Sequence, residues 1–148
     1  MQARSVTVES QLLGETIRQA VAQGGSFVLT VTGSSMCPTL KPGRDQVCLT
    51  APGKIRRGDI LFFRREHGGY VLHRCIGMKN GIYIVNGDSQ NWMEAVLPEQ
   101  IVAVASRICR KGRWMDCGSV SLRLYGCLWP ATRKLRPALI RLKGRLLK

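Results

Sequence analysis

The stretch DILFFRREHGGYVLHRCIG (residues 59–77) decides the fold class of this chain. It contains two apolar runs, residues 59–64 and 69–77, which are joined by a polar, glycine-rich segment. Short runs rich in aromatic and branched residues, bounded by Gly and Asp, are typical of β-strands joined by turns. The stretch therefore predicts two strands connected by a hairpin-like turn.

Four more runs of this kind predict further strands, at residues 26–32, 46–50, 82–86 and 101–109. Short strands at this spacing, separated by Pro, Gly and Asp turns, favour an all-β barrel or sandwich. Before the first strand, apolar residues recur at helical spacing from Glu9 to Gln23, with Ser10 as the candidate N-cap and a glycine pair at the end. This pattern predicts one amphipathic helix.

Positive charge is concentrated in the C-terminal part of the chain. The 148 residues carry a formal net charge of +14. Residues 107–148 hold 12 Lys or Arg and one acid, Asp116, which gives +11, whereas residues 1–106 carry only +3. Such a charge indicates either a polyanionic partner, nucleic acid or an anionic membrane surface, or a solubilising field.

Leucines recur at helical spacing within this basic region, at positions 135, 139, 142 and 146. Seven Lys or Arg residues lie between positions 133 and 148, and Pro130 and Pro137 divide the region into short helices. The pattern is typical of an amphipathic basic helix. Two interpretations stay open: the helix lies on an anionic membrane, or it packs on the core with a solvated basic face.

The cysteines and the hydropathy favour a cytoplasmic protein. The six cysteines include no Cys-x-x-Cys pair, which argues against a zinc site, so no metal or cofactor is expected. The sequence shows no secretory signal pattern, so free thiols in a reducing compartment are favoured over disulfides. No run of about 20 apolar residues predicts a transmembrane segment. Peripheral binding to the inner face of the membrane is compatible with this location.

The segment GSSMCPTL (residues 33–40) carries the candidate nucleophile. Gly33 allows a sharp turn and Pro38 stiffens the exit, so that the hydroxyl of Ser35 would project in a fixed direction. A serine hydroxyl is a weak nucleophile unless a neighbouring base takes its proton. A base must therefore come from elsewhere in the chain.

The two histidines differ in context. His67 lies in the polar turn, where an exposed structural role is favoured. His73 lies inside the apolar strand YVLHRCIG (residues 70–77), where it is either a core histidine or a functional base. With an ordinary pKa near 6.5, a histidine accepts a proton at neutral pH without the strong depression that a lysine would need. His73 is the candidate base.

Four segments carry a resemblance to a known family. GSSMCPTL fits the signal peptidase signature G-x-S-M-x-P-T-L at every fixed position, and residues 33–106 resemble the catalytic core of that family, part of the LexA/signal peptidase superfamily. IRRGDILFF (residues 55–63) is similar to its G-D-I-V-x-F strand, and NGDSQN (residues 86–91) is similar to its G-D-N box. His73-Arg74 resembles the His-Arg of the endoplasmic-reticulum and archaeal type, whereas bacterial members carry Lys-Arg.

The resemblance implies a coiled β-barrel core and Ser-His peptidase chemistry by Ser35 and His73. Asp88, within the box, is the first candidate to orient His73, and Glu94 is the second; the choice stays open. The Ser35 backbone N–H would bind the oxyanion, and we expect the oxyanion and substrate-binding region to be formed by its neighbours Gly33, Ser34 and Met36.

The chain is thus predicted to be mainly β, with an N-terminal amphipathic helix (residues 1–25), a catalytic β-domain (26–114) and a basic amphipathic helical tail (115–148). The expected function is that of a serine endopeptidase of the signal peptidase type, cleaving a peptide or protein with a leader- or signal-like segment. One alternative is a catalytically idle binding module on the same barrel.

The other alternative is a LexA-like regulator that cleaves itself and binds DNA. It would require a Ser-Lys pair and a cleavage segment ahead of the core. The single Cys-Gly bond, Cys117-Gly118, follows the core instead. Nucleic acid is therefore a disfavoured partner.

Overall fold

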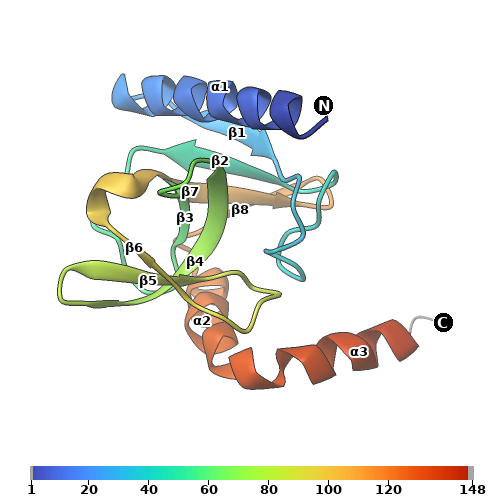
Figure 1. Cartoon of the computed structure of the whole chain (residues 1–148). Coiled ribbons are helices and arrows are strands. Elements are labelled where there is room, and N and C mark those ends of the chain that lie inside the picture. The colour runs from blue at the N-terminus through green and yellow to red at the C-terminus, as the bar shows by residue number, and fades with distance from the viewer. Residues whose placement is uncertain (1, 147–148) are drawn as a thin grey trace.

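The computed structural model describes the backbone of residues 2–146 and the side chains of residues 10–139, 141, 142 and 145. The helical elements are α1 (Gln2–Ala22), η1 (Pro98–Gln100), α2 (Val120–Leu128), η2 (Trp129–Leu135) and α3 (Arg136–Leu146). The strands are β1 (Phe27–Thr30), β2 (Gln46–Thr50), β3 (Ile60–Arg64), β4 (Tyr70–Lys79), β5 (Ile82–Asn86), β6 (Glu94–Val96), β7 (Ile101–Arg110) and β8 (Arg113–Asp116). Helix α1 lies on one side of the strands, and α2, η2 and α3, which we call the C-terminal arm, lie on the other (Figure 1).

The strands form one antiparallel sheet in the order β1-β2-β7-β3-β4-β5-β6, and β8 pairs with β7. The prediction of a mainly β protein is confirmed. The sheet is open: within the described residues no pairing joins β1 to β6. These two strands have only four and three residues, which offers few backbone groups for closing a barrel.

Both faces of strand β3 are buried, which explains its uninterrupted apolar run. Successive side chains of a strand point to opposite faces. Ile60 and Phe62 therefore join a first core cluster with Ile17 and Val21 of α1, while Leu61 and Phe63 join a second cluster. The second cluster also contains Cys75, Val85 and Val96. His73 follows the same alternation along β4, and it lies on the side of the second cluster.

The strand predictions at residues 46–50 and 82–86 match β2 and β5 residue for residue. Strands β6 and β8 were not predicted. The N-terminal helix begins at Gln2 rather than at Glu9, so the prediction of Ser10 as N-cap is wrong. No Gly or Pro interrupts residues 2–13, and the helix continues through Ser10.

The basic region is divided near both prolines, as predicted: Pro130 stands at the start of η2 and Pro137 at the start of α3. The side chains of Lys143 and Leu146, and the whole of Lys148, lie outside the described residues.

Among the described residues, no helix combines the length and hydropathy that crossing a membrane requires. All six cysteines are free, and Cys75 and Cys109 are buried.

Helix α2 approaches the turn before β3 so closely that a glycine is needed on it. A Cβ on Gly126 would lie 2.9 Å from Nη1 of Arg74, and it would lie 3.0 Å from the carbonyl oxygen of Gly58. Gly58 itself has a φ of +97°, which favours glycine. The arm is therefore seated on the core by backbone contact.

We expect Gly126→Ala to lower the free energy of unfolding by about 1–3 kcal/mol through overpacking. A decrease in stability would be informative, because alanine in a helix interior normally raises the free energy of unfolding by roughly 1 kcal/mol relative to glycine. Urea denaturation of the full chain measures it. Gly53→Ala is the control, since a Cβ there meets nothing within 4 Å. A Gly126→Ala variant as stable as wild type would contradict the close approach.

Candidate active site

The turn that carries Ser35 follows β1 and is anchored by its buried neighbours. Met36 is 1% exposed and packs in the first core cluster, and Thr39 is 2% exposed. Ser35 is half-buried between exposed Ser34 and buried Met36. These buried residues anchor the turn immediately after Ser35.

A second segment, the loop of residues 87–90 after β5, is bonded to the serine turn. The Ser89 N–H donates to the Ser35 carbonyl at 2.9 Å, and the Ser89 hydroxyl donates to the Ser34 carbonyl at 3.1 Å. A Cβ on Gly87 would lie 2.8 Å from the Ser35 carbonyl oxygen. Position 87 therefore has to be glycine for the loop to approach the turn this closely.

Asp88 is fully buried and its carboxylate binds Arg74. Arg74 donates from Nε to Oδ1 at 2.8 Å and from Nη2 to Oδ2 at 2.7 Å, a bidentate arrangement. Thr39 also donates its hydroxyl to Oδ2. Asp88 makes no hydrogen bond to His73, so in this structure it orients the arginine beside the histidine instead.

His73 is buried beside Glu94. Its Nδ1 lies 3.4 Å from Oε1 of Glu94, and its ring meets Phe63 edge-on with centroids 5.8 Å apart. Glu94 also accepts two hydrogen bonds from Arg65. Of the two acids considered from the sequence, Glu94 is the one in contact with the imidazole.

Burial lowers the pKa of His73 from its usual 6.5 to about 4. The carboxylates of Glu94 and Asp88 oppose this change, and the nearby charge of Arg65 adds to it. The imidazole is thus neutral at pH 7 and able to accept a proton. Its basicity is weaker than the ordinary value assumed from the sequence, because desolvation disfavours the imidazolium.

Ser35 and His73 are not hydrogen-bonded to each other. Both ring nitrogens of His73 are buried and make no hydrogen bond. Ser35 opens instead into a groove of about 170 Å³, with Gly33 and Met36 among its lining residues and Phe62, Tyr70 and Leu72 forming its apolar wall. Catalytic hydrogen bonds are often long in enzymes without substrate, so a Ser-His unit here would have to close when a substrate binds.

The backbone around Ser35 has one open donor. Among the described residues, none accepts a hydrogen bond from the Ser35 N–H. The Ser34 carbonyl is already bonded to the Cys37 N–H at 3.0 Å and to the Ser89 hydroxyl. A Cβ built on Gly33 would meet nothing within 4 Å, so the space beside this residue is open.

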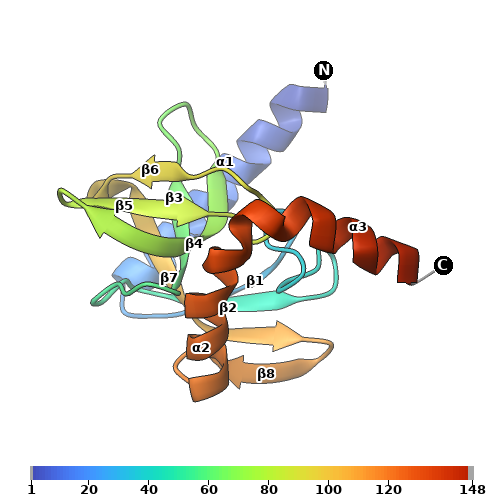
Figure 2. The same cartoon turned by 90° about the horizontal axis from the view of Figure 1, so that it is seen from below.

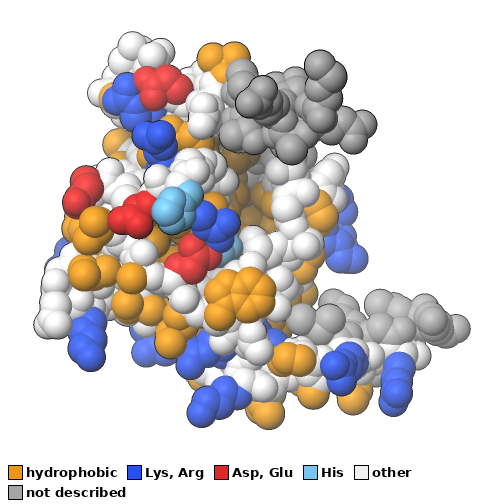
Figure 3. Space-filling view, in the orientation of Figure 1, with side chains coloured by type: hydrophobic (Ala, Val, Ile, Leu, Met, Phe, Trp, Pro, Cys, Tyr) orange, Lys and Arg blue, Asp and Glu red, His pale blue; other side chains and the backbone are white. Residues whose placement is uncertain are grey.

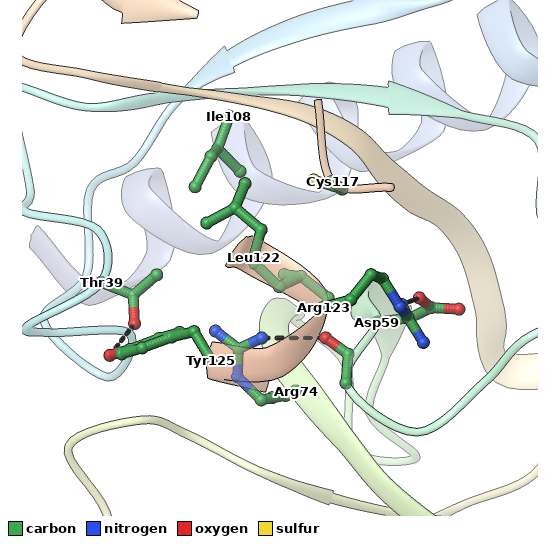
Figure 4. A pocket seen from close by; sticks show the side chains of 10 residues that line it. Thr39, Asp59, Arg74, Ile108, Cys117, Leu122, Arg123 and Tyr125 are labelled. Carbon is green, nitrogen blue, oxygen red and sulfur yellow. Dashed lines mark hydrogen bonds and ion pairs between the residues drawn. The ribbon is translucent and has the colours of Figure 1, made fainter. Parts of the chain in front are cut away.

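The C-terminal arm contacts the loop of residues 87–90 and Thr39, which the sequence did not predict. The Trp129 indole N–H donates to the Asp88 carbonyl at 2.9 Å. Because the single proton of Thr39 goes to a carboxylate, Tyr125 must donate in their 2.8 Å hydrogen bond. Figure 4 shows Tyr125 lying between Thr39 and Arg74, where α2 meets the core.

The space among these residues is small. The cavity lined by Thr39, Arg74, Tyr125 and their neighbours has about 20 Å³, room for roughly one water molecule (Figure 4). It is a packed junction between arm and core, whereas the groove beside Ser35 is the larger opening. Of these two spaces, only the groove beside Ser35 is large enough to hold more than a few water molecules.

Arg136, at the start of α3, is fully buried in the same junction. Its Nη1 donates to Asn86 Oδ1 and to the carbonyls of Gly87 (3.0 Å) and Gln90 (2.8 Å), and its Nη2 donates to Trp129 (3.0 Å). Desolvation lowers the pKa of Arg136, and the charge of Asp88 opposes this. No local sequence signal distinguishes this arginine from the other basic residues of the tail.

His67 is exposed in the turn between β3 and β4, as expected from its polar surroundings in the sequence.

Comparison of the chain with models of known protein families and with curated proteins gives no match.

The contacts of His73 predict how its pKa responds to mutation. Arg65→Gln should raise the pKa above the wild-type value, because it removes a positive charge and releases Glu94. Glu94→Gln should lower it further, because the favourable carboxylate is lost. Titration of the His73 imidazole C–H signals by NMR measures both. A shift of the same sign in both variants would contradict the geometry.

Proposed function

We propose that this protein is a serine endopeptidase of the signal peptidase type. The observation that carries the proposal is convergence: the Ser35 turn and the His73-Arg74 strand are both bonded to the segment of residues 86–90. This segment is also the one whose sequence resembles the family's G-D-N box. The Ser35 turn, Arg74 and the G-D-N-like segment therefore meet at one place, and His73 lies next to Arg74 on the opposite face of β4.

The proposed roles follow from the contacts. Ser35 attacks the scissile carbonyl, and neutral His73 takes the hydroxyl proton as the bond between Oγ and the carbonyl carbon forms. Glu94, 3.4 Å from Nδ1, stabilises the imidazolium. The Ser35 N–H donates to the developing oxyanion. His73 then returns the proton to the leaving amine. In the second stage water takes the place of the serine hydroxyl: His73 accepts a proton from the water as it attacks the acyl-enzyme, and it returns the proton to Ser35 as the ester bond breaks.

An extended peptide is the substrate that the groove suits. One side of the groove is formed by Leu29, Thr30 and residues just after β1, an edge strand whose outer backbone groups are unpaired within the described residues. An edge strand can bind an extended peptide by main-chain hydrogen bonds. The apolar wall of Phe62, Tyr70 and Leu72 would take uncharged side chains, as a leader-like segment supplies. The six free thiols support a reducing compartment for this reaction.

Ser35→Ala should lower peptidase activity by at least about 1,000-fold while leaving the fold intact, because it removes a single half-buried oxygen. Labelling by a serine-directed fluorophosphonate probe and cleavage of a leader-peptide library measure the loss. Ser26→Ala, at an exposed serine outside the groove, is the matched control and should retain both activities. Undiminished cleavage by Ser35→Ala would sink the proposal, and absence of labelling and cleavage in wild type would favour the idle binding module.

The identity of the base is tested by the pH dependence of kcat/KM. With His73 as base, activity should fall with acid around pH 4, where the buried imidazole gains its proton, and the midpoint should move to higher pH in Arg65→Gln. His73→Ala should be inactive and His67→Ala active. Loss of activity in Lys79→Ala, with His73→Ala unaffected, would instead establish a Ser-Lys mechanism.

A further inference from the structure

The C-terminal arm exposes a row of leucines that the core does not use. Along α2, η2 and α3 the exposed fractions are 57%, 65%, 63%, 45% and 59% for Leu124, Leu128, Leu135, Leu139 and Leu142. A single exposed leucine is ordinary on a protein surface. Five along one helical arm are a concentration of exposed apolar side chains, and such concentrations mark interaction sites.

The same arm carries positive charge only. From residue 117 to residue 148 the sequence contains eight Lys or Arg and no Asp or Glu. Lys134, Arg141 and Arg145 are exposed beside the leucines. In Figure 3, basic and hydrophobic side chains line the lower edge of the molecule, over α2 and α3, whereas the acidic ones in that view lie higher.

The arm is held to the core by other residues, which leaves the leucines outward. Gly126, Pro130 and Arg136 are its buried members. Trp129 and Arg136 make hydrogen bonds to the 87–90 loop. In Figure 1 the arm lies along the lower side of the molecule, and in Figure 2, which is seen from below, α2 and α3 lie in front of the strands.

Two more exposed apolar side chains adjoin the arm. Trp92 and Met93, in the loop before β6, are 56% and 51% exposed. The Met93 sulfur is 2.9 Å from Nη1 of Arg133. Tryptophan beside basic residues is the composition of protein surfaces that sit at the lipid headgroup level.

We propose that this face, made of the outward leucines and basic residues of the C-terminal arm together with Trp92 and Met93, docks on an anionic lipid surface. Nucleic acid would bind the basic residues but would leave the leucines in water. A second copy of this chain would bring two charges of +14 together. An anionic membrane meets both requirements, since its headgroups pair with Lys and Arg and its acyl region takes leucine and tryptophan.

Docking by this face has a geometric consequence that does not depend on the proposed reaction. Arg136 joins α3 to the 87–90 loop, and that loop binds the Ser35 turn through Ser89. The Ser35 turn would therefore be held close to the lipid surface. This location is a property of the arm, and it would persist in a Ser35→Ala protein.

Co-sedimentation of the full chain with vesicles tests the proposal, using phosphatidylcholine with and without phosphatidylglycerol at low and high salt. Wild type should bind the anionic vesicles, and Arg141→Gln with Arg145→Gln should weaken binding at low salt by about 30-fold, with a much smaller effect at high salt. Leu139→Gln with Leu142→Gln should weaken it by about tenfold or more at both salt concentrations.

Matched variants elsewhere control for net charge and hydropathy. Arg64→Gln with Lys79→Gln removes the same charge from exposed positions on β3 and β4, and Leu12→Gln with Leu13→Gln changes exposed leucines of α1. Both pairs should bind like wild type, and circular dichroism verifies that every variant is folded. Equal loss in the arm and control pairs, equal binding to neutral vesicles, or no binding would overturn the proposal. DNA retention that depends on the arginines alone, with no vesicle binding, would overturn it in favour of nucleic acid.

Discussion

The buried ion pair between Arg74 and Asp88 is the interaction on which the site depends. Arg74 reaches Asp88 through two hydrogen bonds and the Gly58 carbonyl through a third, at 2.8 Å. The pair thereby connects β4, the loop after β5 and the turn before β3. Removing one partner of a buried pair leaves an uncompensated charge, which typically costs about 3–5 kcal/mol. The position of the loop that binds Ser35 is thus set by electrostatics as well as by packing.

This ion pair also determines which of the two acids lies beside the histidine. Adjacent residues of a strand point to opposite faces, so Arg74 and His73 face different surroundings. Asp88 is fully engaged on the Arg74 side by the arginine and by Thr39. On the other side His73 meets Phe63 and Glu94, a mostly apolar environment that keeps the imidazole neutral. The loop of residues 87–90 therefore supplies the carboxylate that binds Arg74, and strand β6 supplies the one beside the imidazole.

Sequence patterns predicted the parts of this structure that local chemistry determines. Strands β2 and β5 were located to the residue because alternating or continuous apolar runs end at clear turn residues. Strands β6 and β8 have three and four residues and depend on pairing with β5 and β7, which no local pattern reveals. In the site, Ser35 and His73 stood out by motif, whereas Arg136 reaches Asn86 across 50 residues of sequence. A tail rich in arginine gives no sign of which arginine is buried.

The arm shows that the two interpretations left open by the sequence do not exclude each other, because only one of its faces packs on the core. The sequence offered a helix that either packs on the core or lies on a membrane, as though one excluded the other. Arg136 and Trp129 face the core and saturate carbonyls of the loop beneath the serine turn, while the exposed leucines take no part in that contact. Burying Arg136 among neutral acceptors is costly by desolvation, and it is tolerated because four acceptor groups surround it. The hydrogen bonds of Arg136 and Trp129 thus hold one face of the arm on the core, and the exposed leucines lie outside that contact.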